Sequence, residues 1–225
     1  MTGTVLITGA GRGIGQQLAD QYLTQGWTVL ACARKSADLD ALANRGAETF
    51  RLEVTSDQDV AALKSALDGR PIDVLINNAG IIGPDRQALS DMDYDGWAET
   101  IAVNVFAPFR VSTALAGNVA AAKGKIAVVS SKMGSMGLNV SSDRIAYRSS
   151  KAAVNQVVVN MANEWRSRDI TVIAMHPGWV STDMGGAQAP VTPAESAAGL
   201  IRTIAAATPD KSGHFFNFDG DELDW

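Results

Sequence analysis

The chain has 225 residues, of which 46% are hydrophobic and 19% charged, and its formal net charge is -5. This length suits one domain or at most two. The acidic balance, without a run of basic residues, argues against nucleic acid or an anionic membrane surface as a partner. Cys32 is the only cysteine, so an intrachain disulfide and a cysteine-based metal cluster are excluded. His176 and His214, the only histidines, lack the spacing of a helical zinc pair. The first apolar run, at residues 5–7, is too short for a signal peptide or a membrane span. We therefore expect a cytoplasmic protein that binds no metal.

The first part of the chain predicts a strand, a glycine-rich turn, a helix and a second strand. Residues 4–8 are apolar and β-branched, as in a buried strand, and run into the glycine-rich segment 9–15. From Ile14 onward, apolar residues recur every four positions, as on one face of a helix. Gly26 stands where a left-handed C-cap is expected, and residues 27–33 predict the next strand. Together these elements form a βαβ unit.

The glycines of this turn have a mechanical role. Without side chains they let the backbone turn tightly and let a pyrophosphate approach the helix N-terminus, whose free N–H groups favour anions. The spacing of Gly9, Gly13 and Gly15 is G-x-x-x-G-x-G, which differs from the G-x-G-x-x-G fingerprint. A glycine-rich turn without a ligand is the alternative. The strand before it and the helix after it favour a dinucleotide site.

The end of the second strand bears on the choice of cofactor. An Asp or Glu there would bind the ribose 2′-hydroxyl of NAD, but residues 31–35 read Ala-Cys-Ala-Arg-Lys. Arg34 in this segment and Arg12 in the glycine turn could both contact a 2′-phosphate through their forked donors. The alternative is that both are solvated surface arginines. The sequence favours NADP(H) over NAD(H).

The rest of the chain continues to alternate between strands and helices. Strands are expected at 48–54, 72–76, 126–130, 170–175 and 214–218, and helices at 36–44, 57–67, 94–123, 144–166 and 193–206. The long stretch 94–123 is expected to contain two segments that meet near Asn104, and a loop is expected around residues 83–85. This order predicts an α/β protein with a single doubly wound parallel sheet, Rossmann-like, with helices on both faces. We expect residues 1–225 to form one dinucleotide-binding catalytic domain, with a short substrate loop at about 183–192.

Tyr147 and Lys151 are the strongest candidates for chemistry. Residues four apart on a helix share a face, so the ammonium of Lys151 is expected to favour the ionised phenol and lower the pKa of Tyr147. A tyrosine ordinarily loses its proton near pH ~10, and one tuned in this way could exchange a proton with an alcohol near neutrality. A Tyr and a Lys at this spacing also occur by chance as an exposed helical pair, so the interpretation depends on the neighbouring motifs.

Those motifs resemble the short-chain dehydrogenase/reductase family along almost the whole chain and in the family's order. The resemblance is carried by Thr8 to Gly15, Asn77-Asn78-Ala79-Gly80, the set Asn104, Ser131, Tyr147 and Lys151, and Pro177-Gly178 followed by Thr182. Two further segments, 130–135 and 176–186, and the ending 215–225 resemble the compact carbonyl-reductase and C-factor-like branch.

The resemblance implies a catalytic tetrad. Tyr147 would donate a proton during carbonyl reduction, and Ser131 would hydrogen-bond the substrate oxygen. Lys151 would also hold the nicotinamide ribose, and Asn104 would fix a water that links Lys151 to solvent. The cofactor contacts implied, besides Tyr147 and Lys151, are Gly9, Arg12, Gly13, Ile14, Gly15, Arg34, Glu53, Val54, Asn78, Ala79, Gly80, Pro177, Gly178, Val180 and Thr182.

Several positions depart from the family's pattern or leave alternatives open. Tyr147 lies sixteen residues after Ser131, a longer spacing than in most family members, and the extra residues around 139–143 are expected to form a loop beside the site. Glu53 stands where the family usually has Asp. Ser130 and Ser135 compete with Ser131 for the serine role. We expect His176 to be structural, since the implied proton relay is complete without it.

The long helix could serve a second purpose. Its row Ala152, Val157, Met161 and Trp165 is expected to face the sheet. In the family this helix and the preceding one also form a four-helix contact, so a homodimer or homotetramer is implied.

Three functions remain compatible with these residues. The first is an NADPH-dependent carbonyl reductase of small or aromatic ketones and aldehydes, with residues 184–189 as a gate over the cofactor. The second is a dinucleotide-binding regulatory or signalling module with incidental turnover. The third is the same site working mainly as an alcohol dehydrogenase.

Overall fold

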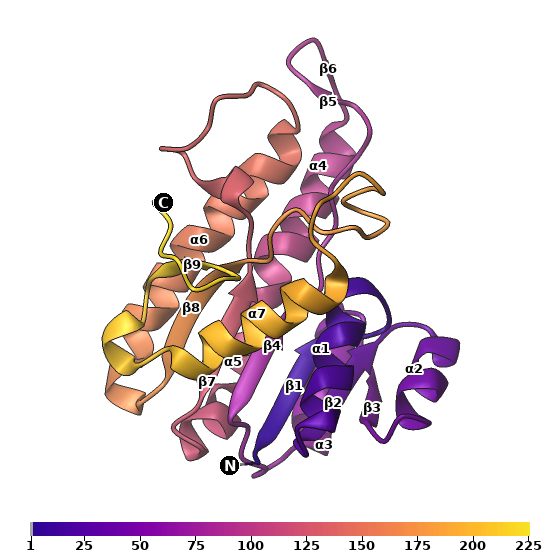
Figure 1. Cartoon of the computed structure of the whole chain (residues 1–225), viewed down its shortest axis with the longest axis vertical. Helices are drawn as coiled ribbons and strands as arrows, with labels where there is room; N and C mark the ends of the chain where they lie inside the picture. Colours follow the sequence, from indigo (N-terminus) through magenta and orange to yellow (C-terminus); the bar gives the residue numbers. More distant parts are fainter. Residues whose placement is uncertain (1) are drawn as a thin grey trace.

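A computed structural model describes residues 2–225 and places seven parallel strands in one sheet (Figure 1). In sheet order the strands are β3 (Glu48–Arg51), β2 (Thr28–Ala33), β1 (Thr4–Thr8), β4 (Val74–Asn77), β7 (Lys125–Val129), β8 (Thr171–His176) and β9 (Phe215–Asn217). Every neighbouring pair is parallel; Ile7, for example, lies beside Ala31 on one side and Ile76 on the other. The order runs outward in both directions from β1 and β4, which confirms the predicted doubly wound sheet.

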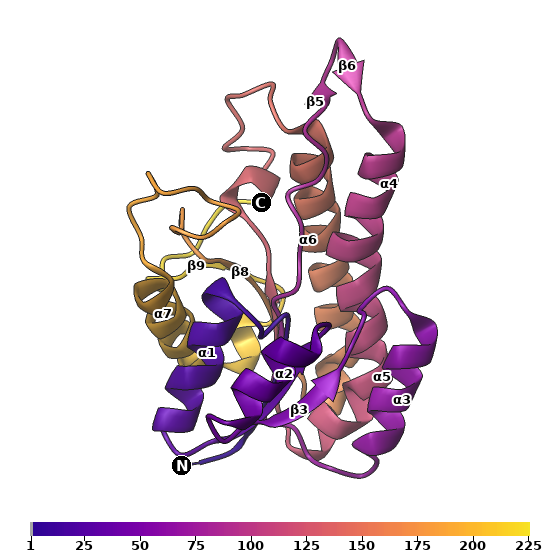
Figure 2. The ribbon, with the colours of Figure 1, turned by 90° about the vertical axis from the view of Figure 1, so that its right-hand side faces the viewer.

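Helices cover both faces of this sheet (Figure 2). On one face lie α1 (Gly13–Thr24), α2 (Ser36–Ala43) and α7 (Pro193–Ala206), and on the other lie α3 (Asp57–Ala66), α5 (Ala107–Ala121) and α6 (Ile145–Trp165), with α4 (Tyr94–Ile101) beside α6. Successive residues of β1 enter different cores: Val5 and Ile7 pack beneath α1 and α7, while Leu6 packs on the opposite side. The continuous apolar runs in the sequence follow from this burial on both faces.

The helix ends follow local capping chemistry. Gly26 has a φ of 79° just after α1, where a side chain would be strained. The side chain of Ser56 caps α3 by accepting from the amide of Asp59. Thr192 and Glu195 form a reciprocal capping box at the start of α7. These caps satisfy backbone groups at the helix ends that have no partner within the helix.

The junction predicted near Asn104 is a π-helical segment, Ala102–Phe106, between α4 and α5. Its cause lies in the sequence, because Pro108 follows Asn104 by four residues. A proline has no N–H to bond the carbonyl four residues earlier, and its ring clashes with that carbonyl. The helix widens there instead of continuing with an α-helical pitch.

Two details differ from the sequence interpretation. A small hairpin, β5 (Gln87–Ala88) with β6 (Asp91–Met92), follows the predicted loop and was not anticipated. On α6, Met161 and Trp165 are buried as expected, but Ala152 and Val157 are only half-buried, and Val158 faces the core fully. The hydrophobic pattern of α6 is broad enough to suit more than one facing, and packing against β8 selects one of them.

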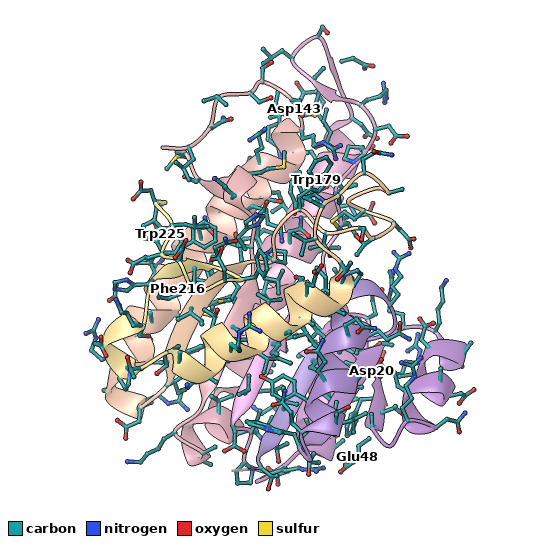
Figure 3. All side chains as sticks on the ribbon, in the orientation of Figure 1. Asp20, Glu48, Asp143, Trp179, Phe216 and Trp225 are labelled. Carbon is teal, nitrogen blue, oxygen red and sulfur yellow. The ribbon has the colours of Figure 1, made fainter. Side chains whose placement is uncertain are left out.

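The carboxyl ends of all seven strands meet at one edge of the sheet. Figure 3 shows Asp143 and Trp179 toward this end of the molecule and Glu48, which begins β3, at the other. Of the helices within residues 2–225, none is both long and apolar enough to cross a membrane.

Candidate active site

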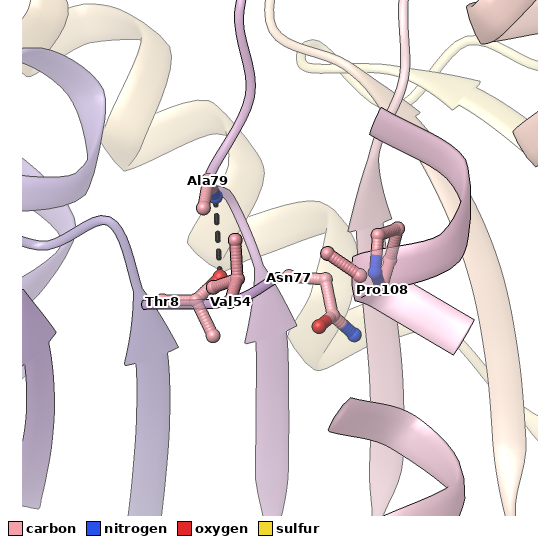
Figure 4. A pocket seen from close by; sticks show the side chains of 6 residues that line it. Thr8, Val54, Asn77, Ala79 and Pro108 are labelled. Carbon is pink, nitrogen blue, oxygen red and sulfur yellow. Dashed lines mark hydrogen bonds between the residues drawn. The ribbon is translucent and has the colours of Figure 1, made fainter. Parts of the chain in front are cut away.

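Beyond the carboxyl ends of β1 and β4, hydrogen bonds join the loop that follows β1 to the loop that follows β4. The Thr8 hydroxyl accepts from the backbone amides of Asn78 (3.0 Å) and Ala79 (3.1 Å). The Asn78 amide donates in turn to the carbonyls of Thr8 (3.0 Å) and Gly9 (3.1 Å). Figure 4 shows Ala79 held over Thr8 at this point, which is the switch point of the sheet. In open α/β sheets, ligands bind at this position.

The glycine turn lies against these hydrogen-bonded loops, and its glycine positions leave little or no room for a side chain. Gly9 has a φ of 65°, and a Cβ there would lie 2.9 Å from the Cα of Ala79. A Cβ on Gly15 would collide with the carbonyl oxygen of Gly9. Gly13, with a φ of 56°, would place a Cβ 3.3 Å from the side chain of Thr182. The turn is thus a cradle of bare backbone that leads into α1.

The start of α1 has the properties of an anion site. No side chain caps its first turn, so the N–H groups of that turn are available to a phosphate, and the helix dipole favours a negative charge there. Ile14, half-buried in this turn, packs on the core below and holds the turn in place. The predicted pyrophosphate site is therefore formed by residues that fit a dinucleotide.

A small pocket beside these hydrogen-bonded loops is lined by residues that lie far apart in the sequence. Val54, which follows β3, and Ala79 line it together with Thr8, Asn77 and Pro108 (Figure 4). Val54 and Ala79, two of the predicted cofactor contacts, therefore lie close together in the fold.

The two arginines expected at a 2′-phosphate are both exposed and already paired with carboxylates. Arg12 lies 2.6 Å from Asp183, with both side chains 79% exposed, and Arg34 lies 3.3 Å from Glu53. Burial raises the pKa of Glu53, but hydrogen bonds from Thr55 and Arg34 outweigh it and the net pKa lies below its usual value. A phosphate bound here would compete with these carboxylates for the guanidinium groups.

Ser131 and Tyr147 converge at the same edge. Ser131 follows β7, is buried, and accepts from the amide of Met133 at the start of a short 3-10 turn. Its side chain interacts with the Tyr147 hydroxyl, which favours the phenolate. The two competing serines have structural partners: Ser130 donates to Asn155, and Ser135 accepts from the amide of Leu138.

Lys151 and Asn104 lie in the same region as Tyr147. The Nζ atom of Lys151 lies 5.6 Å from the centre of the Tyr147 ring and donates to the carbonyl of Val129 (2.8 Å). Gly80 lies close to both Asn104 and Lys151. A Cβ on Gly80 would lie 3.2 Å from Oδ1 of Asn104 and 3.7 Å from Nζ of Lys151. The four tetrad residues come from α6, the π-helical segment and the end of β7, and they gather beside the segment that follows β4.

The expected effect of Lys151 on Tyr147 requires a correction. Burial raises the pKa of Tyr147 above its ordinary value; Ser131 and Arg144 lower it, but by less. Tyr147 is only 8% exposed, and the cost of placing a charge in that setting dominates. Burial also lowers the pKa of Lys151 to about 8. In this structure Tyr147 therefore keeps its proton at neutral pH, as a proton donor must.

The segment after β8 is shaped to face the glycine turn. Gly178 has a φ of 86°, and a Cβ there would lie 3.0 Å from the ring of Phe218. The Pro177 carbonyl accepts from the Ser196 hydroxyl (2.6 Å). Val180 is buried and forms a bridge with Val191 across the base of the predicted substrate loop.

Thr182 organises the start of that loop. Its hydroxyl accepts from the amide of Gly185 (3.2 Å) and its carbonyl from the amide of Gly186 (2.8 Å). Trp179 closes the turn by donating its indole N–H to the Gly185 carbonyl (2.8 Å). The loop is therefore a folded turn that lies close to Gly13.

His176 ends β8 next to this segment. Burial, with the nearby positive charge of Lys132, lowers the pKa of His176 to about 4, while Asp219 acts in the opposite direction. The imidazole is therefore neutral at neutral pH, which is compatible with the expected structural role. Within residues 2–225 no group of three or more His, Cys, Asp or Glu is placed to hold a metal ion.

The sequence interpretation missed Gln87, whose side chain binds the backbone of Tyr147. The two residues are 60 positions apart, and a lone glutamine after a glycine-proline loop carries no local signal of such a contact.

Comparison with known proteins places this site in a family. Residues 3–191 match the family model described as short chain dehydrogenase. The chain therefore belongs to the short-chain dehydrogenase/reductase family and is an NAD(P)-dependent oxidoreductase. Within the family it falls in the carbonyl-reductase and C-factor-like branch, as the motifs around Ser131 and His176 indicate.

Three similar proteins serve as examples. The chain is 42% identical to C-signal of Myxococcus xanthus over 156 residues, which cover 69% of this chain and 93% of that protein. It is 35% identical to 1-hydroxy-2-glutathionyl-2-methyl-3-butene dehydrogenase of a Rhodococcus species, over 99% of both chains. The structure of NADPH-bound carbonyl reductase from chicken fatty liver has a TM-score of 0.90 and 30% identity, covering 99% of this chain and 98% of that one.

Proposed function

We propose that this protein is an NADPH-dependent carbonyl reductase that reversibly reduces a ketone or aldehyde to an alcohol. The observation that carries the proposal is the convergence of the Tyr147 and Ser131 hydroxyls beside the glycine cradle. The NADPH-bound carbonyl reductase of the same fold adds support. A protonated phenol and a second hydroxyl at one point form a site for a carbonyl oxygen that gains negative charge.

The roles of the four residues follow from their surroundings. When bound, the reduced dinucleotide supplies the hydride. Tyr147 donates its proton to the carbonyl oxygen, and Ser131 hydrogen-bonds that oxygen and orients it. Lys151 is held on the Val129 carbonyl with its Nζ atom 5.6 Å from the centre of the Tyr147 ring, and there it would hold the nicotinamide ribose. Asn104 takes part through its position behind Lys151, where a water could return the proton.

Arg12 and Arg34 support the preference for NADP(H) over NAD(H). Arg12 lies in the glycine turn and Arg34 follows β2, and both side chains are exposed enough to rotate from a carboxylate onto a phosphate. No acidic residue stands at the end of β2 to bind a ribose 2′-hydroxyl in the way that NAD-selective sites use. Glu53, in the next strand's loop, is engaged by Arg34.

The exposed side chains near the site favour an apolar substrate. Met136, Trp179 and Met184 belong to the two loops that flank Ser131 and Thr182, and all three are exposed large hydrophobic residues. The loop at 183–192 would act as a small lid. We therefore propose small or aromatic ketones and aldehydes as the substrate class.

A signalling function is the second candidate, because C-signal is 42% identical to the matched part of the chain. An NAD(P)-binding signalling module with incidental turnover would need only the cofactor cradle. The intact Ser131, Tyr147 and Lys151 favour the enzyme. A homodimer or homotetramer and a cytoplasmic location remain predictions, the former measurable by light scattering.

Turnover of a carbonyl panel with NADPH and with NADH, followed by the absorbance of the reduced nicotinamide, tests the proposal. Tyr147→Phe should abolish turnover while leaving NADPH binding intact, because only the acidic proton is lost. Tyr94→Phe is the matched control, since Tyr94 is an exposed tyrosine on α4. Retained turnover in Tyr147→Phe would assign the acid to another group, and a wild type that reduces none of the panel would favour the signalling module.

A further inference from the structure

The helix that carries Tyr147 begins without a cap of its own. Arg144, which precedes α6, is in the left-handed region with a φ of 52°, and its side chain makes no capping hydrogen bond. The first N–H groups of a helix have no partner within the helix and need one from elsewhere. The amide of Tyr147 is the third of α6, the position that an N-cap side chain ordinarily serves.

Gln87 supplies the missing acceptor from another part of the chain. Its Oε1 atom accepts from the amide of Tyr147 at 3.0 Å, and the residue is only 8% exposed. Its Nε2 atom donates to the carbonyls of Ile82 (3.1 Å) and Pro84 (2.6 Å). The orientation of the amide is fixed by these partners, since two carbonyls need its N–H₂ group and an N–H needs its oxygen.

The loop that Gln87 holds is itself tied to Asn104. The amide and the carbonyl of Ile81 both bond the side chain of Asn104, at 2.9 and 2.8 Å. Gly83 has a φ of 90°, and a Cβ there would lie 3.3 Å from Nε2 of Gln87, so the loop packs closely on the amide. A continuous run of hydrogen bonds and backbone therefore joins Asn104 through residues 81–84 to Gln87 and Tyr147.

We infer that Gln87 is a positioning residue for the reaction, and this inference rests on the proposed function. Its hydrogen bond to the Tyr147 amide fixes the first turn of α6 and thereby keeps the Tyr147 hydroxyl in position beside Ser131. The reacting groups of an enzyme tolerate little displacement, and a misplacement of about 1 Å can cost ~100-fold in rate. Within residues 2–225 the hydrogen bonds of the Gln87 side chain all go to main-chain atoms, and its bond to Tyr147 is made with the backbone amide, so its effect passes through the backbone of Tyr147.

Two substitutions separate positioning from simple stability. Gln87→Met keeps the length of the side chain and removes all three hydrogen bonds, so kcat should fall about tenfold while the Kd for NADPH changes less than about twofold. Gln87→Glu keeps the acceptor for Tyr147, but its carboxylate faces two carbonyls at neutral pH. Protonation restores one donor, so the ratio of its kcat to that of the wild type should rise as the pH falls. Gln156→Met, on the exposed side of α6, is the matched control and should change neither quantity.

Hydrogen exchange provides a readout that does not require turnover. In Gln87→Met the amides at the start of α6 should exchange faster than in the wild type, while Gln156→Met leaves them unchanged. Unchanged exchange, or an unchanged kcat in both Gln87 variants, would overturn the inference. If Gln87→Met does not fold, Gln87→Glu alone provides the test. A ratio of its kcat to that of the wild type that does not change with pH would overturn the inference. A wild type without carbonyl reduction would refute the proposed function alone, since the exchange test would still stand.

Discussion

Lys151 should reduce the stability of the fold that contains it. Its side chain is 5% exposed and its nearest hydrogen-bond partner is the Val129 carbonyl. Burial lowers the pKa of Lys151 from 10.5 to about 8, because a charged ammonium loses solvation in that position. Replacing it with methionine, which is similar in length and uncharged, should remove this cost together with the proposed chemistry.

The size and sign of the effect follow from proton linkage. At about 1.4 kcal/mol for each tenfold change, a pKa of about 8 against 10.5 in the unfolded chain corresponds to about 3 kcal/mol. Between these values the unfolded chain binds more protons than the folded chain, so stability rises with pH across that window. Below about pH 8 both states are protonated and the full cost is present. Lys151→Met leaves the Val129 carbonyl without this donor, a loss of about 1–3 kcal/mol, so its net gain at pH 7 should be about 0–2 kcal/mol.

Urea unfolding near pH 7 and near pH 10 measures the difference directly. The wild type should gain up to about 3 kcal/mol from this residue over that range, and Lys151→Met should lack that increment. Lys64→Met is the control, because Lys64 is exposed on α3 and should leave the pH dependence as in the wild type. Equal pH dependence in the wild type and Lys151→Met would refute the buried-charge reasoning.

Three further predictions concern the cofactor, the C-terminal residues and a helix cap. Arg34→Asp should lower kcat/KM for NADPH and raise it for NADH, by charge repulsion at the 2′-phosphate; an unchanged ratio in steady-state assays would remove Arg34 from that role. The indole ring of Trp225 stacks on Phe215 with ring centres 5.4 Å apart, so Trp225→Ala should lower the free energy of unfolding by about 1 kcal/mol, with Trp225→Phe losing less. Thr192→Ala should lower the free energy of unfolding by about 1 kcal/mol, because it removes the capping box of α7. Urea titration should detect this loss while kcat stays unchanged. A lower kcat would instead link the cap to the loop at 183–192.

The features that the sequence predicts well are those with local causes. The burial of β1 on both faces is written in its unbroken apolar run, and the role of Gly9 follows from a conformation that other residues avoid. The π-helical junction also has a local origin, since Pro108 lies four residues after Asn104. Such features need no knowledge of distant partners; the handedness of βαβ crossovers then limits the possible topologies, and the structure supplies the strand order.

The features that escaped prediction depend on contacts between distant segments. The ion pair of Arg12 with Asp183 joins residues 171 positions apart, and the cap of Tyr147 by Gln87 spans 60. The raised pKa of Tyr147 is likewise tertiary, because it results from burial rather than from spacing along the helix. Helical spacing predicts that Lys151 and Tyr147 share a face, but it does not predict how deeply either side chain is buried.

The surroundings of Asn104 limit what this residue can contribute to the reaction. Its side-chain N–H₂ group donates to the Ile81 carbonyl and the Ser150 hydroxyl, and its Oδ1 atom accepts from the Ile81 amide. The side chain is therefore occupied in holding the loop after β4. The main-chain carbonyl differs, because Pro108 has no N–H to form the α-helical bond with it. A water that connects Lys151 with solvent through Asn104 would therefore need the main-chain carbonyl as its acceptor, because the side-chain groups of Asn104 already have partners.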